Sequence, residues 1–220
     1  SIACHHLDPP GGCVRDAVAN ARGNARYRGV VFDELEHSRL LWPYTPTPLA
    51  DASKFETLRQ GHDGTFEAYR KLESKFGAPG STVTATHVWP VMHHIVARAG
   101  FAVCPKICKE FFSPVSLAIG MGAAKQYGRE LWADCDLWFY DMIPGHPPEE
   151  FKSNLLLAYW LGVDLVYVEG AGFNLHPAGN QGLPFSLVNK ISDNDYQLTP
   201  HGEVLRWFCR EYVPAYPRGY

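Results

Sequence analysis

Short apolar runs alternate with longer segments of helix-like composition along the chain. Each apolar run ends in polar or charged residues, a pattern typical of parallel strands joined by crossover helices. The predicted strands span residues 1–7, 29–34, 82–89, 101–107, 130–139 and 164–169. The predicted helices span residues 14–22, 65–76, 90–99, 116–127, 148–161 and 199–212. We therefore expect an α/β fold.

Helix-end signals support these boundaries. Thr199 precedes Pro200, so we expect it to cap the last helix at its N-terminus. Glycines follow four predicted helices, where a left-handed cap residue is expected; these are Gly77, Gly100, Gly128 and Gly162. Two long connections, 36–64 and 170–198, interrupt the rhythm, and long loops after strands are where α/β enzymes build sites.

Two architectures fit this alternation, a doubly wound open sheet and a (β/α)₈ TIM barrel. We prefer the barrel, because no glycine-rich phosphate fingerprint follows the first strand and polar residues gather at the ends of many strands. A full barrel needs eight strands and about 250 residues. The 220 residues hold only six strand–helix units, so we expect a single barrel domain that lacks its natural start and its first two units.

Alternation within the strands places polar side chains on one rim. In residues 130–139, Trp132, Asp134, Asp136 and Trp138 share one face. Each aspartate alone could equally be a cap or an ion-pair partner, but unpaired buried charges are costly, so two on one face favour a site. With the other strand ends, the predicted rim carries Glu34, His87, Trp89, Lys106, Asp134, Asp136, Tyr167 and Glu169.

Several rim residues have simpler interpretations. Glu36 is expected to be solvated, and Lys106 could merely balance Glu34. His87 could be a structural histidine that is hydrogen-bonded in the core. Glu169 could be a substrate ligand, a catalytic carboxylate or an ion-pair partner. The collective pattern around one rim is the main indication of a site.

Charge and composition narrow the possible partners. Lys and Arg number 20 and Asp and Glu 23, which gives a net charge of −3, and no run of like charges favours nucleic acid or a membrane surface. No apolar stretch approaches the roughly 18–20 residues of a membrane span, so we expect a soluble protein. Six scattered cysteines permit either redox compartment. Aromatic residues reach 13% of the chain and suit either a core or sugar stacking.

Carboxylates flanked by tryptophans suit glycoside hydrolysis, in which one carboxyl protonates the leaving oxygen and another attacks or activates water. The chain resembles the retaining (β/α)₈ glycoside hydrolases, which carry an acid/base at the end of strand four and a nucleophile at the end of strand seven. Residues 30–34 and 131–136 fall on those strands, and residues 198–203 resemble the close of such barrels.

The resemblance implies that Glu34 is the acid/base, with apolar surroundings or a nearby carboxylate raising its pKa. The usual Asn-Glu pair is here Asp33-Glu34, and aspartates replace the strand-seven glutamate. The second carboxylate is therefore Asp134, Asp136 or Glu169, and an inverting reaction stays open. We expect a carbohydrate substrate, no cofactor and no metal. The predicted substrate-binding residues are His6, His87, Trp89, Lys106, Trp132, Trp138 and Tyr167.

Two other functions stay open. A metal-dependent hydrolase could draw on His5-His6, His93-His94 or the Cys104/Cys108 pair. Adjacent histidines diverge on a strand or helix, however, and one Cys-x₃-Cys is a weak zinc signal. A barrel that binds carbohydrate without turnover would need only aromatic residues and one carboxylate.

Overall fold

The computed structural model describes residues 2–4, 13–21, 24, 26–36, 50–77, 79–108, 112–137, 146–169, 187–192 and 195–219. The predicted substrate-binding residues His6 and Trp138 lie outside these ranges. None of the described helices combines the length and the hydrophobicity that crossing a bilayer requires.

The chain has an α/β fold, as predicted. Within the described ranges, six strands follow one another in chain order across one sheet: β1 (Ile2–Cys4), β2 (Gly29–Phe32), β3 (Thr82–His87), β4 (Ala102–Ile107), β5 (Trp132–Asp136) and β6 (Leu165–Glu169). The pairs β1–β2, β2–β3, β3–β4 and β4–β5 are parallel. This order has no reversal of the kind that defines a doubly wound sheet. It also supplies six of the eight strands of a full barrel, so the structure does not confirm a complete barrel.

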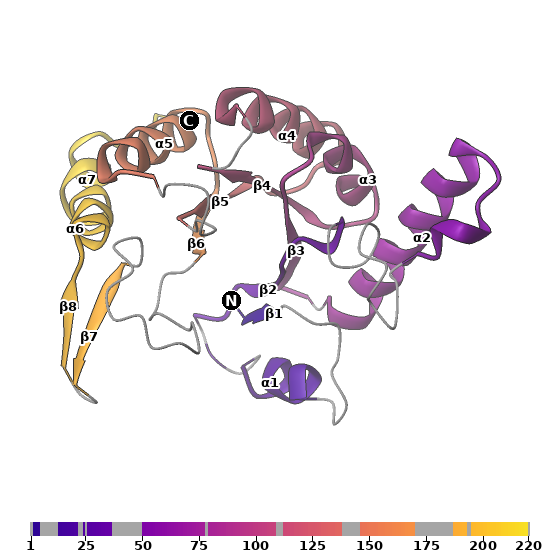
Figure 1. Cartoon of the computed structure of the whole chain (residues 1–220), viewed down its shortest axis with the longest axis horizontal. Coiled ribbons are helices and arrows are strands. Elements are labelled where there is room, and N and C mark those ends of the chain that lie inside the picture. Colours follow the sequence, from indigo (N-terminus) through magenta and orange to yellow (C-terminus); the bar gives the residue numbers. More distant parts are fainter. Residues whose placement is uncertain are drawn as a thin grey trace. The chain divides into compact units, whose positions relative to one another are not determined.

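Two compact units make up the chain, and β4 and β5 each contribute to both. The first comprises residues 1–105 and 115–132, and the second residues 106–114 and 133–220. The first contains α1 (Cys13–Ala21), α2 (Leu58–Phe76), α3 (His93–Arg98) and most of α4 (Ser113–Tyr127). The second contains α5 (Pro148–Trp160), β7 (Val188–Ser192), β8 (Asp195–Leu198), α6 (Pro200–Trp207), a π-helical segment (Phe208–Tyr212) and α7 (Val213–Ala215) (Figure 1).

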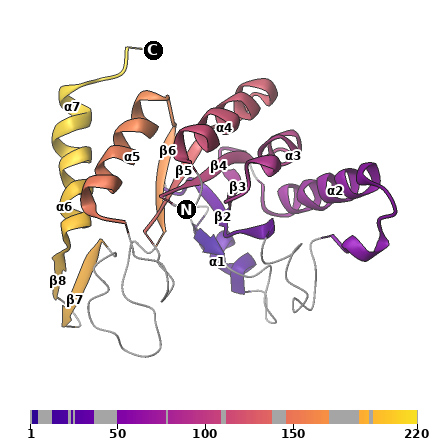
Figure 2. The same ribbon diagram turned by 45° about the horizontal axis from the view of Figure 1, so that its top comes forward.

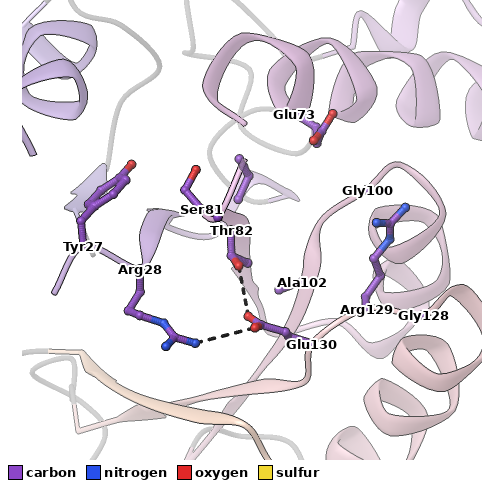
Figure 3. A pocket seen from close by; sticks show the side chains of 12 residues that line it. Tyr27, Arg28, Glu73, Ser81, Thr82, Gly100, Ala102, Gly128, Arg129 and Glu130 are labelled. Atoms are coloured by element: carbon purple, nitrogen blue, oxygen red, sulfur yellow. Dashed lines mark hydrogen bonds and ion pairs between the residues drawn. The ribbon is translucent and has the colours of Figure 1, made fainter. Parts of the chain in front are cut away.

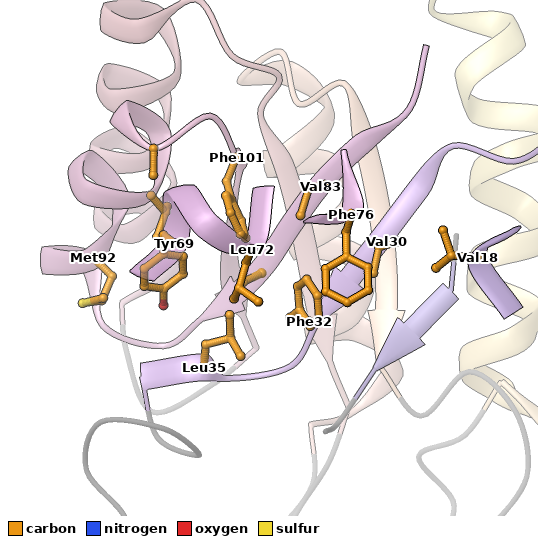
Figure 4. Packing of buried hydrophobic residues seen from close by; sticks show 13 residues of the cluster. Val18, Val30, Phe32, Leu35, Tyr69, Leu72, Phe76, Val83, Met92 and Phe101 are labelled. Carbon is orange, nitrogen blue, oxygen red and sulfur yellow. The ribbon is translucent and has the colours of Figure 1, made fainter. Parts of the chain in front are cut away.

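Aromatic side chains from β2 and α2 build the core of the first unit (Figure 4). Phe32 on β2 meets Phe76 edge-on, with ring centroids 5.3 Å apart. Tyr69, about two turns before Phe76 on the same face of α2, meets Phe101 at 5.2 Å. All four rings are buried, and edge-to-face pairs of this kind add to the stability from area burial. The core therefore anchors α2 to the strands that carry Glu34 and His87.

The last helices of the second unit pack through an aromatic cluster. Helix α5 lies beside α6 in both ribbon views (Figures 1 and 2). Tyr159 of α5 contacts the rings of Phe208 and Tyr212, with centroids 5.7 and 6.1 Å apart. Its hydroxyl donates a hydrogen bond to the carbonyl of Tyr216 at 2.7 Å. Thr199 caps α6 as predicted, because its hydroxyl accepts from the Gly202 N–H at 3.0 Å.

The differences from the prediction include the following three features. Helix α2 begins at Leu58 rather than residue 65, because Thr57 and Gln60 form a reciprocal capping box. The antiparallel hairpin β7–β8 occupies the end of the predicted 170–198 loop. Gly77 has φ −65° and is not a left-handed cap, whereas Gly100, Gly128 and Gly162 have positive φ as expected.

Candidate functional site

Strands β4, β5 and β6 bring one lysine and three carboxylates together in the second unit. Lys106 pairs with Asp134 in the register of β4 and β5. The Lys106 Nζ lies 3.3 Å from Asp136 Oδ2 and 3.8 Å from Asp134 Oδ2, and it donates a hydrogen bond to Glu169 Oε2. The Glu169 N–H donates to Asp134 Oδ1 at 3.2 Å. We call these four residues the Lys106 cluster.

The Lys106 cluster is almost fully withdrawn from solvent. Lys106, Asp134 and Asp136 expose 1% or less of their surface, whereas the Glu169 side chain is 12% exposed. A charged group buried this deeply is tolerated only when paired. One ammonium can neutralise one carboxylate, so three ionised carboxylates would leave the cluster with two uncompensated negative charges. Glu169 is the member of the cluster that reaches the surface.

Asp134 is the member whose proton affinity is most altered. Burial raises the pKa of Asp134 well above its usual value, Glu169 and Asp136 raise it further by like-charge repulsion, and Lys106 opposes the rise. Asp134 Oδ2 makes no hydrogen bond within the described residues. A carboxyl with a raised pKa keeps its proton to higher pH. The arrangement therefore places a carboxyl with a raised pKa beside two further carboxyl groups that contact a lysine.

Glu34 lies in the first unit, directly after β2. Its backbone has φ 39°, in the left-handed region that a residue with a Cβ rarely adopts. The Thr86 hydroxyl on β3 holds this conformation: it accepts from the Glu34 N–H at 3.3 Å and donates to Asp33 Oδ1 at 3.0 Å. Glu34 is half-buried. Strained backbone at the end of a strand is common at functional sites.

His87, at the carboxyl end of β3, belongs to a buried hydrogen-bonded group in the first unit. Its Nδ1 lies 2.7 Å from the Ala85 carbonyl, which can only accept, so Nδ1 carries the hydrogen. Its Nε2 lies 2.8 Å from the Tyr69 hydroxyl and 3.6 Å from Glu36 Oε2. Burial, together with the nearby Glu36 charge, raises the pKa of Tyr69, so its hydroxyl stays protonated.

Glu36 was expected to be solvated, and this expectation is wrong. The residue is only 2% exposed. Its Oε1 accepts from the Val88 N–H at 2.8 Å, while Oε2 makes no hydrogen bond among the described residues. The sequence places Glu36 on the same strand face as Phe32 and Glu34, and this could have indicated burial. Alternation alone, however, does not distinguish a buried acid from an exposed one.

His93 and His94 do not act together. His93 is buried, with Nε2 3.4 Å from the Ser116 hydroxyl, whereas His94 is exposed. Burial lowers the pKa of His93 to about 3, with contributions from His87 and His94, so its imidazole is neutral. In the part of the chain that the structure describes, no group of three or more His, Cys, Asp and Glu side chains is arranged to hold a metal ion.

The predicted aromatic ligands differ in accessibility. Trp89 is 44% exposed and Tyr167 on β6 is half-buried. Trp132 is fully buried, and its indole N–H donates to Glu130 Oε2 at 2.9 Å. Its ring therefore has no face open to a sugar in this structure.

Comparison of the chain with protein-family models and with curated proteins finds no match to either.

Proposed function

We propose that the protein is a glycoside hydrolase on a barrel-type (β/α) scaffold and that the Lys106 cluster carries its acid–base chemistry. The observation that carries the proposal is the buried group of three carboxylates around one lysine, near the carboxyl ends of consecutive parallel strands. Catalytic residues of (β/α)₈ enzymes come from this end of the strands. The strand order β1 to β6 is that of a singly wound barrel, which supports the scaffold part of the proposal.

The cluster has the charge pattern that glycoside hydrolysis needs. One carboxyl must be protonated to give its proton to the leaving oxygen, and a second must be ionised to attack the anomeric carbon or to activate water. Asp134, with its raised pKa, is the proton holder. In this proposal Asp136 and Glu169, which make the two closest contacts to Lys106, supply the second carboxylate. A carboxyl with a raised pKa beside a second carboxylate is the pattern of an acid/base pair.

Glu169 is the member that contacts substrate in this proposal. It is the most exposed residue of the cluster, and its backbone N–H is bonded to Asp134. Asp134 is fully buried, so in this proposal its proton passes to the leaving oxygen through the Glu169 carboxylate and is regained from the attacking water. Glu34, the acid/base that the family resemblance implies, is the alternative to this assignment and is tested separately.

The experiment is a rate comparison on a panel of aryl α- and β-glycosides. Glu169→Gln is expected to lower kcat/KM by about 10²–10⁴-fold, the typical contribution of one acid–base group. Asp134→Asn is expected to abolish the limb of the pH profile that reports the protonated acid. Glu149→Gln is the matched control, because Glu149 is an exposed acid in the first turn of α5. Full activity of Glu169→Gln and Asp134→Asn on a hydrolysed glycoside would overturn this assignment.

The same assay separates the other candidate functions. Loss of hydrolysis on adding a chelator, with return on adding a divalent metal, would favour the metal-dependent hydrolase. Sugar binding in calorimetry without hydrolysis of any substrate in the panel would favour a barrel that binds carbohydrate. A Glu34→Gln variant that loses activity while Glu169→Gln keeps it would place the acid in the first unit.

A further inference from the structure

A pocket of about 570 Å³ opens at the amino-terminal ends of the strands in the first unit (Figure 3). Its walls come from residues just before β2, β3 and β5, from the start of β4 and from the end of α2. All lining residues belong to the first unit. The volume lies within the usual range of small-molecule sites. This pocket is separate from the Lys106 cluster, and nothing in the proposed hydrolysis uses it.

On one side of the pocket, the charges of Arg28 and Glu130 balance each other. Glu130 Oε2 accepts from the Thr82 hydroxyl at 3.1 Å and from the Trp132 indole at 2.9 Å. Arg28 lies 3.7 Å from Glu130 Oε1 and completes the set (Figure 3). Glu130 is thus oriented by three donors, and the Arg28–Glu130 pair brings no net charge to the pocket.

The other side carries two charges that have no counter-charge within the described residues. Glu73 projects from α2, and Arg129 from the turn before β5 (Figure 3). Arg129 Nε donates to the Ala97 carbonyl at 3.2 Å, which fixes the base of the guanidinium. Within the described residues, neither the Glu73 carboxylate nor the outer nitrogens of Arg129 form a hydrogen bond or an ion pair, with each other or with any other group.

Two glycines leave the space that the Glu73 side chain occupies. A Cβ at Gly100 would lie 2.9 Å from Glu73 Cγ, and a Cβ at Gly77 would lie 2.7 Å from Glu73 Oε1. Gly100 also has φ +110°, a conformation that suits glycine. Side chains at these two positions would push the carboxylate away from its present position. The backbone therefore accommodates a half-buried carboxylate in the pocket wall.

We propose that this pocket binds a small zwitterion of the α-amino acid class, with its ammonium at Glu73 and its carboxylate at Arg129. Glu73 and Arg129 line one cavity and have no counter-charge among the described residues, so together they are complementary to a ligand that carries both charges. Arg129 offers a planar set of donors that matches a carboxylate. A neutral polyol would leave both protein charges without counter-charges, and a simple anion or cation would satisfy only one of them.

Isothermal titration calorimetry with glycine, L-alanine and L-glutamine tests the proposal. At least one of these amino acids is expected to bind, whereas its separate halves, a simple amine such as ethylamine and a simple acid such as propionate, bind at least about tenfold more weakly. Glu73→Gln and Arg129→Gln are each expected to weaken binding at least about tenfold, since each removes a charged hydrogen-bond partner. Glu56→Gln and Arg210→Gln are matched controls, because both residues are exposed and neither lines the pocket.

The possible results of the titration distinguish this proposal from its alternatives. Absence of heat for all three amino acids at 10 mM ligand, with the wild-type protein folded by circular dichroism, overturns the proposal. Binding that survives both Glu73→Gln and Arg129→Gln also overturns it, because the zwitterion would then lie elsewhere. Binding of glucose but of no amino acid would identify a polyol site instead. Hydrolysis of aryl glycosides is measured independently, so failure of the proposed enzymatic function leaves these outcomes unaffected.

Discussion

Acidification should destabilise this protein through one buried histidine, His93. In the folded protein its pKa is about 3, whereas an unfolded histidine titrates near 6.5. The unfolded state therefore binds a proton that the folded state excludes over the whole window between these values. Because the folded pKa is depressed, the contribution of His93 to stability is complete above pH 6.5 and is lost progressively as the pH falls towards 3.

The size of the effect follows from the two pKa values. Between pH 7.5 and pH 5, proton uptake by the unfolded state alone should lower the free energy of unfolding by about 2 kcal/mol. The complete difference between the two pKa values corresponds to an upper limit of about 5 kcal/mol, reached near pH 3. Both figures are large against the roughly 5–15 kcal/mol that stabilise a typical domain.

Urea denaturation at pH 7.5, 6 and 5 measures this effect as a difference between two proteins. His93→Gln removes the titrating group, so its free energy of unfolding should fall by about 2 kcal/mol less than that of wild type over this range. Other titrating groups, including the Lys106 cluster, are present in both proteins and cancel. His94→Gln is the comparison variant: His94 is exposed and contributes less than burial or His87 to the lowered pKa of His93, so this variant should keep most of the pH dependence. A constant difference between wild type and His93→Gln at all three pH values would refute the reasoning.

Three further perturbations have defined outcomes. Lys106→Met leaves buried carboxylates without their cation and should lower the free energy of unfolding at pH 7 by about 3–5 kcal/mol. The loss in free energy of unfolding should be smaller at pH 5. Equal losses at both pH values would contradict the charge assignment. Thr57→Ala should cost about 1 kcal/mol in urea denaturation by removing the α2 cap, and a cost no greater than that of Ser53→Ala would argue against it. Phe76→Ala should cost about 3–5 kcal/mol by leaving a cavity against Phe32, and a thermal melt unchanged from wild type would count against the described core.

The strands could be predicted from the sequence because most of their residues are buried. All positions of β2, β4 and β5 are buried, and buried parallel strands are continuous apolar runs bounded by turn residues. The same burial explains a failure. Alternation separates two faces only when one of them is exposed, so it could not distinguish Trp132, which is fully buried, from a residue that lines an open rim.

The candidate site was predicted in part. The sequence marked Lys106, Asp134, Asp136 and Glu169 because charged residues at strand ends stand out against apolar runs, and the structure brings these four together. It could not mark the pairing of His87 with Tyr69, which joins β3 to a residue 18 positions away on α2. Such a contact depends on how helices lie on the sheet. Neither strand nor helix periodicity encodes that placement.

The Thr86 hydroxyl makes the identities of two positions interdependent. It supplies the acceptor that holds Glu34 at φ 39°. This backbone conformation is strained for glutamate but not for glycine. In any homologue with this backbone, a side chain at position 34 should be accompanied by Ser or Thr at position 86. A glycine at position 34 should release position 86 to become Val or Ala. Paired substitutions at these two positions would therefore indicate common ancestry with this chain even where overall sequence identity is low.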